Sequence, residues 1–180
     1  ADDIVKDALK EFGLAQAELG VSWLGTKALM WAVEKKLPRG PGLYPWSGGD
    51  ALDAKPPLTE ADFEARYEAD PKAKGQAMLV FVHGTASHTL GSFGDLKGGD
   101  RGVWTALERQ FPGGIYGFEH RTLSQSPIDN ACELVGALPA GARVCLVSHS
   151  RGGLVSDLVC LDDFARLIPD YKYEFEGIGH

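Results

Sequence analysis

The sequence predicts an α/β fold in which a mostly parallel sheet is flanked by helices. Two short runs, 77–82 and 144–147, are continuously apolar and rich in β-branched residues, as the buried strands of a parallel sheet are. Segments with helical spacing of apolar residues, 103–111 and 128–138, lie between these runs, and a third short apolar run, 115–118, separates the two segments. Strands that alternate with helices in this way indicate βαβ units with parallel strands.

Residues 1–37 are predicted to form a helical extension that precedes an α/β core at residues 38–180. Apolar side chains recur at helical spacing from Ile4 to Leu19, and a second helical segment ends before Pro38. We expect this pair of helices to pack on the core. Its tryptophans leave a docking or membrane-surface role as the alternative.

The segment that leads into the first buried strand is rich in proline and glycine. Residues 42–46 and 51–54 are expected to pair as a small hairpin, and Pro45 would confine its strand to a sheet edge. Thr59 and Asp62 have the spacing of a capping box, which predicts a short helix to about residue 69. A polar, glycine-rich loop is predicted between the strand at 77–82 and residue 102.

The segment Ser148-His149-Ser150-Arg151-Gly152 stands between the strand at 144–147 and a helix predicted to run to about residue 168. It is the G-x-S-x-G pattern with serine in place of the first glycine. In that pattern a sharp strand-to-helix turn exposes the central serine at the N-terminus of a helix, and small flanking residues let neighbouring backbone pass close by. We therefore predict that Ser150 is a nucleophile. The alternative is a turn between strand and helix with no chemical role.

With the earlier strand that ends in His83-Gly84-Thr85, this motif makes the chain resemble the α/β-hydrolase superfamily, and within it the bacterial lipase-like or esterase-like branch. The resemblance spans about residues 42–159 and includes the stretches 79–85 and 122–128. It implies an α/β-hydrolase fold with Ser150 as the nucleophile. It also implies an oxyanion hole formed by the backbone N–H groups of Arg151 and Thr85, with Ala86 as the second candidate on the loop.

Four histidines are candidates for lining the site, together with Ala86. The resemblance gives His83 a structural role in shaping the oxyanion loop. His149 flanks the nucleophile, where packing or a hydrogen bond is expected rather than catalysis. His88 and His120 are placed on loops at the carboxyl edge of the sheet, where ligands bind in such folds.

The catalytic acid and base are missing from the pattern. In this fold they follow the nucleophile along the chain, but the only histidine after Ser150 is His180, and the first three acids fall on the helix that leads away from the serine. No further strand clearly follows, which would leave the strand at 144–147 with a bare edge. We therefore expect the sequence to be the N-terminal portion of a longer protein whose C-terminal portion supplies the missing strands, acid and base.

Composition narrows the range of partners and cofactors. The net charge of −7 and the scattered basic residues argue against a nucleic-acid partner.

The three cysteines lie in apolar patterns and are expected to be buried and reduced, as in the cytoplasm: Cys132, Cys145 and Cys160. The acidic start of the sequence lacks the character of a signal peptide. No His/Cys cluster has metal-ligand spacing, and no cofactor is expected.

Two functions remain. The first is a serine hydrolase that cleaves a carboxylic ester, of lipase or esterase type, with an acyl ester as substrate. The second is a catalytically silent α/β-hydrolase-fold module used for binding or as a scaffold. Within the first, residue chemistry does not separate lipase, esterase, thioesterase and peptidase.

Overall fold

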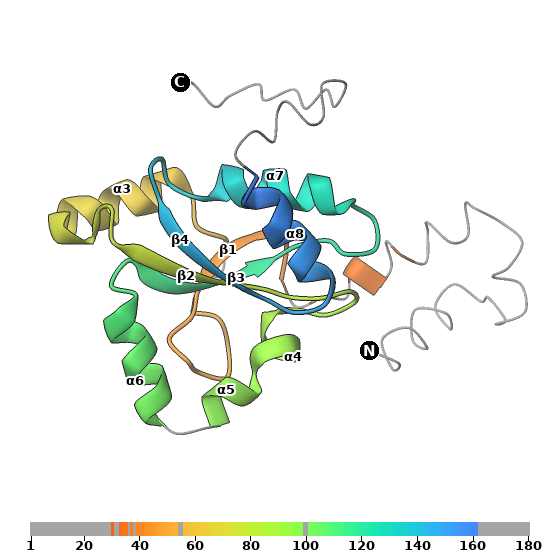
Figure 1. Ribbon diagram of the computed structural model, residues 1–180, viewed down its shortest axis with the longest axis horizontal. Helices are drawn as coiled ribbons and strands as arrows, with labels where there is room; N and C mark the ends of the chain where they lie inside the picture. Colours follow the sequence, from red (N-terminus) through yellow and green to blue (C-terminus); the bar gives the residue numbers. More distant parts are fainter. Residues whose placement is uncertain are drawn as a thin grey trace, which may run out of the picture.

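The computed structural model describes residues 30, 33–35, 37, 39–53, 56–98 and 101–161 of the 180-residue chain. Their centre is a four-stranded sheet with the strand order β1-β3-β2-β4 (Figure 1). The strands are β1 (Gly42–Pro45), β2 (Ala77–Val82), β3 (Gly114–Glu119) and β4 (Arg143–Ser148). The predicted parallel strands are confirmed, because β3, β2 and β4 run parallel, but β1 pairs antiparallel with β3 and makes the sheet mixed.

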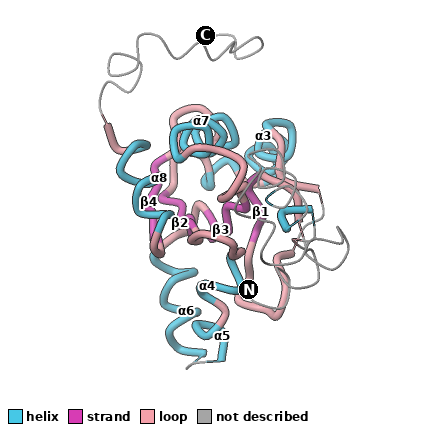
Figure 2. The backbone as a smooth tube through the Cα atoms, turned by 90° about the vertical axis from the view of Figure 1, so that its right-hand side faces the viewer, coloured by secondary structure: helices cyan, strands magenta, loops and turns pink. Residues whose placement is uncertain are grey.

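Helices cover both faces of this sheet, so the α/β class is confirmed (Figure 2). On one face lie α3 (Glu60–Ala69), α7 (Pro127–Ala137) and α8 (Arg151–Val159). On the other lie α4 (Thr89–Phe93), α5 (Asp95–Gly98) and α6 (Arg101–Gln110). A short 3-10 helix, η1 (Pro71–Ala73), precedes β2. The capping box at Thr59 and Asp62 begins α3 as predicted, and Ser126 with Asp129 forms a second one at the start of α7.

Each face has its own hydrophobic core, because successive side chains of a strand point to opposite faces. Met78, Val80 and Val82 of β2 belong to the cluster under α3, α7 and α8. Leu79 and Phe81 belong to the cluster on the side of α4 and α6. In that second cluster Trp46 packs edge-on against Phe81 and Trp104, with ring centroids 5.3 and 4.8 Å apart.

Two neighbouring strands of the sheet lead to opposite faces. The chain leaves the carboxyl end of β2 toward α4, on one face, and leaves the carboxyl end of β4 into α8, on the opposite face. β2 and β4 are neighbours and run parallel. Ligands of open α/β sheets bind where adjacent strands lead to opposite faces, just outside their carboxyl ends. The residues that follow Val82 and Ser148 are therefore well placed for function.

Several local predictions were wrong. The expected hairpin of residues 42–46 with 51–54 does not form, because the backbone of β1 pairs with β3 instead. The helix after Ser150 ends at Val159, with Cys160 as its C-cap, rather than near 168. Part of the predicted loop after β2 is helical, as α4 and α5.

β4 has the bare edge that the sequence predicts, because among the described strands only β2 pairs with it. Its apolar run has the composition of a buried strand, yet its residues are exposed or only half-buried. Val147 is 38% exposed, and Leu154 on the neighbouring α8 is 56% exposed. Of the three unpaired cysteines, Cys132 is buried as predicted, whereas Cys145 on β4 and Cys160 after α8 are exposed.

The N-terminal extension lies almost entirely outside the described residues. Residues 30 and 33–35 are helical, as the sequence predicts. In the described part of the chain, no helix combines the length and the apolar character needed to cross a membrane.

Candidate active site

Ser150 occupies a strained turn between β4 and α8. Its φ of 55° and ψ of −123° are rare for a residue with a side chain, and Ser150 is exposed at the N-cap of α8. The turn is held by hydrogen bonds from His149 N–H to the Val82 carbonyl (3.0 Å) and from Gly152 N–H to the His149 carbonyl (3.0 Å). A serine kept in such a conformation by its surroundings points to a functional role.

Two glycines let the backbone of β2 approach this turn. A Cβ on Gly152 would lie 2.2 Å from the Val82 carbonyl oxygen and 2.7 Å from that of His83. A Cβ on Gly84 would lie 2.9 Å from Cβ of Ser150. The loop after β2 therefore touches the serine turn, and the two motifs predicted to cooperate lie side by side.

The loop after β2 also contains the predicted N–H donors. Ala86 has a positive φ of 49°, and its N–H donates to Thr122 Oγ1 at 2.8 Å. This bond engages Ala86 N–H, which leaves Thr85 as the better candidate of the two. Arg151 is the first residue of α8, where backbone N–H groups have no partner within the helix.

The side chain of Arg151 ties the start of α8 to the start of α7. Its guanidinium donates to Asn130 Oδ1 and to the Gln125 carbonyl, both at 2.6 Å. Asn130 is fully buried. Partial burial lowers the pKa of Arg151 below its ordinary value, and Arg remains charged at neutral pH because that value is so high. The side chain of Arg151 thus joins the starts of α7 and α8, while its backbone N–H is a candidate donor to a substrate oxygen.

His83 and His120 form a buried stacked pair at the carboxyl edge of β2 and β3, with ring centroids 4.1 Å apart. His83 Nδ1 lies 3.0 Å from the Gly84 carbonyl oxygen, and its Nε2 accepts from His120 N–H at 3.3 Å. Burial lowers the pKa of His83, and burial with the neighbouring His83 lowers the pKa of His120 to about 3. Both rings are therefore neutral at pH 7, and their contacts are with each other and with main-chain groups at this edge of the sheet.

The remaining histidines are placed differently. His149 is exposed beside Ser150, and its ring stands edge-on to Phe93 of α4 at 6.5 Å between centroids. His88 caps α4, where its Nδ1 accepts from Gly91 N–H at 3.2 Å. No described histidine is thus bonded to Ser150. His180 lies outside the described residues.

Glu34 joins this edge of the sheet from the N-terminal segment, a contact that no sequence pattern predicts. Its side chain is 1% exposed. Oε1 accepts from Leu123 N–H (2.8 Å) and Ser124 N–H (3.2 Å), Oε2 accepts from Ser124 Oγ, and Arg121 lies 4.0 Å away. The partners are 89 and 90 positions away in the sequence, and nothing in the helical pattern distinguishes Glu34 from a solvated glutamate.

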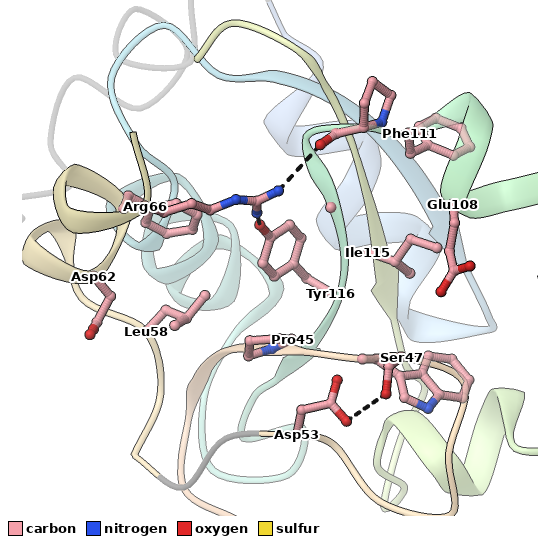
Figure 3. A pocket seen from close by; sticks show the side chains of 14 residues that line it. Pro45, Ser47, Asp53, Leu58, Asp62, Arg66, Glu108, Phe111, Ile115 and Tyr116 are labelled. Carbon is pink, nitrogen blue, oxygen red and sulfur yellow. Dashed lines mark hydrogen bonds between the residues drawn. The ribbon is translucent and has the colours of Figure 1, made fainter. Parts of the chain in front are cut away.

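Cavities open at both edges of the sheet. At the carboxyl edge, a cavity of about 620 Å³ is lined by Tyr44, His88 and Glu119. A second cavity there, of about 230 Å³, is lined by Glu34, His120 and Arg121. Arg39 lines both cavities. A third, of about 350 Å³, lies at the opposite edge, at the start of β3 (Figure 3). There Arg66 reaches across to Tyr116. This cavity is at the wrong end of the strands to serve Ser150.

In the described part of the chain, no group of three His, Cys, Asp or Glu side chains could hold a metal ion. The groups near Ser150 are an exposed hydroxyl, backbone N–H groups and a helix N-terminus.

Comparison with known proteins gives one match. The model of a family described as "Domain of unknown function (DUF7379)" matches residues 53–163. The matched stretch is more than half of the chain and contains β2, β3, β4 and both loops of the site. No curated protein and no solved structure matches. The chain belongs to the DUF7379 family.

Proposed function

We propose that this protein is a serine hydrolase of the α/β-hydrolase type that cleaves carboxylic esters, with Ser150 as the nucleophile. The observation that carries the proposal is the backbone of Ser150. A positive φ on a serine, between a parallel strand and a helix, matches the strained turn by which such enzymes expose their nucleophile. The close approach of Gly84 to Ser150 supports the pairing of this turn with an oxyanion loop.

In the proposed reaction, Ser150 Oγ attacks the ester carbonyl carbon while a general base takes the hydroxyl proton. The N–H groups of Arg151 and Thr85 stabilise the negative charge that develops on the carbonyl oxygen, and the N-terminus of α8 favours the same charge. Collapse of the tetrahedral intermediate breaks the bond to the alcohol, which leaves with the proton. Water then hydrolyses the acyl-serine by the reverse sequence of proton transfers and releases the acid.

The general base and its acid are proposed to come from outside the described residues. Both histidines buried beneath the oxyanion loop are bonded to main-chain groups, and His88 is engaged in a helix cap. The exposed edge of β4 and the apolar side chains of Val147 and Leu154 support a further partner at this side of the sheet. We propose that the remaining C-terminal portion of the protein adds strands there and brings the acid and base with it.

A fluorophosphonate probe tests the proposal, because it phosphonylates only a serine that is activated as a nucleophile. The longest natural form of the protein is labelled alongside Ser150→Ala, with Ser148→Ala as the matched control two residues away. We expect labelling of the wild type and of Ser148→Ala, and none of Ser150→Ala. A well-folded wild type that takes no label would refute the hydrolase and favour the silent binding module. Hydrolysis of p-nitrophenyl esters of increasing chain length then distinguishes esterase from lipase.

A further inference from the structure

The loop at residues 121–126, here named the bridging loop, joins three separate parts of the chain. Thr122 accepts the hydrogen bond from Ala86 in the loop after β2. The Gln125 carbonyl accepts from Arg151 at the start of α8. Leu123 and Ser124, which lie between these two contacts, donate their N–H groups to Glu34.

The bridging loop has no regular secondary structure, so its shape depends on these contacts. A carboxylate that accepts two backbone N–H groups and a hydroxyl makes charge-assisted hydrogen bonds, which are among the stronger ones in proteins. Glu34 is nearly fully buried, and burying a carboxylate is unfavourable unless it is paired in this way. Glu34 is therefore the anchor that fixes the middle of the loop.

Thr122 transmits this anchoring to the candidate oxyanion loop. It is buried, and it directly precedes the residue whose N–H binds Glu34. Its hydroxyl holds Ala86, a non-glycine residue with positive φ, directly after Thr85. A shift of the bridging loop would lengthen the Thr122–Ala86 bond and release the Thr85 N–H from its position.

We propose that Glu34 is a positioning residue for the oxyanion hole, acting through Thr122, so that the N-terminal segment is part of the catalytic unit. The inference rests on the proposed function of Ser150. It assigns a role to a residue that lies outside the matched stretch 53–163 and outside both motif loops.

The test compares two variants at Glu34 and two at Thr122. At each position, one variant keeps the hydrogen-bond acceptor and the other removes it. Glu34→Gln keeps an oxygen for the two N–H groups, and Thr122→Ser keeps the hydroxyl. Glu34→Ala and Thr122→Val remove them. Displacement of catalytic groups by about 1 Å costs on the order of a hundredfold in rate. We expect kcat for a p-nitrophenyl ester to fall by roughly ten- to a hundredfold in the removing variants, with KM little changed. Glu34→Gln and Thr122→Ser should retain most of the activity.

A control separates positioning from loss of stability. Arg66→Met removes hydrogen bonds to Gly113, Pro112 and Tyr116 at the opposite edge of the sheet. It should lower the melting temperature but leave kcat unchanged. The double variant Glu34→Ala/Thr122→Val should lose little more than either single variant, because both act through one loop. If Glu34→Ala does not fold, Thr122→Val with its serine counterpart carries the same comparison.

The outcomes for the two proposals are distinct. If wild-type labelling depends on Ser150 and both removing variants keep wild-type kcat, the positioning role is refuted and the hydrolase stands. If no labelling depends on Ser150, the hydrolase fails and the positioning role fails with it. Losses in kcat that are additive in the double variant would show that Glu34 does not act through Thr122.

Discussion

Replacing Gly152 with alanine should damage both the fold and the serine turn, whereas the same change at Gly153 should not. A Cβ at 152 would stand 2.2 Å from the carbonyl oxygen of Val82, about 1 Å short of an ordinary contact. The obstacle is the backbone of the central strand, which cannot rotate away. At Gly153 the nearest atom is Ser148 Oγ at 3.9 Å, so a methyl group fits.

The magnitude follows from these distances. Overpacking a tight site typically costs about 1–3 kcal/mol, and a clash with two backbone carbonyls places Gly152→Ala at the upper end. Gly153→Ala replaces glycine within α8, which gains up to about 1 kcal/mol from helix propensity. The two variants should therefore differ by roughly 3 kcal/mol in the free energy of unfolding.

Urea unfolding of the two variants and the wild type measures this difference through the transition midpoint, at constant slope. The fluorophosphonate labelling rate should also fall in Gly152→Ala, because the turn must move away from β2. Equal midpoints for the two variants would refute the close packing of α8 on β2 that brings Ser150 next to Gly84.

Three further predictions concern other contacts. Arg151→Met should destabilise the protein by about 1–3 kcal/mol, measured by urea unfolding, because the buried Asn130 Oδ1 loses the hydrogen bond from Arg151. Arg151→Lys should recover only part of this stability, since one ammonium group cannot replace the bonds to both Asn130 and the Gln125 carbonyl. The pKa of His120 is lowered from 6.5 to about 3, so the unfolded chain binds a proton between these pH values that the folded chain does not, and stability should fall as pH drops through this window. His120→Phe should flatten that fall in chemical denaturation. Finally, in the folded 180-residue chain Cys145 and Cys160 should react quickly with a disulfide reagent, because both are exposed. Cys132 should react only after unfolding, since it is buried and burial also raises its pKa.

Much of the sheet could be predicted because its strands are short, apolar and bounded by glycine and proline. β2 is found at the predicted residues 77–82, and Pro127 begins α7 as its restricted φ favours. The predicted hairpin partner of β1 is wrong because a sequence pattern favours pairing between nearby segments. The strand that β1 pairs with, β3, lies more than seventy positions away. The apolar run of β4 by itself indicates a buried strand, and only the lack of a clear strand pattern after it predicts the bare edge that the described sheet shows.

The candidate site divides in the same way. Ser150, Gly84 and Gly152 belong to motifs whose spacing is visible in the sequence, and the structure brings them together. Glu34 and Asn130 carry no such signal, because their contacts arise only when distant segments meet at one edge of the sheet. The positive φ of Ala86 was not expected either, since alanine gives no hint of a left-handed backbone.

The pairing of β2 with β4 has a consequence for how the protein folds. Val82 pairs with Ser148, so a loop of more than sixty residues must close before the two halves of the site meet. Local hydrogen bonds can form α6 and α7 early, whereas this contact between distant segments is of the kind that slows folding. During refolding, the proposed fluorophosphonate reactivity of Ser150 should therefore return after the bulk of the helical circular dichroism signal. The nascent chain likewise cannot assemble the serine turn against Gly84 until β4 has left the ribosome.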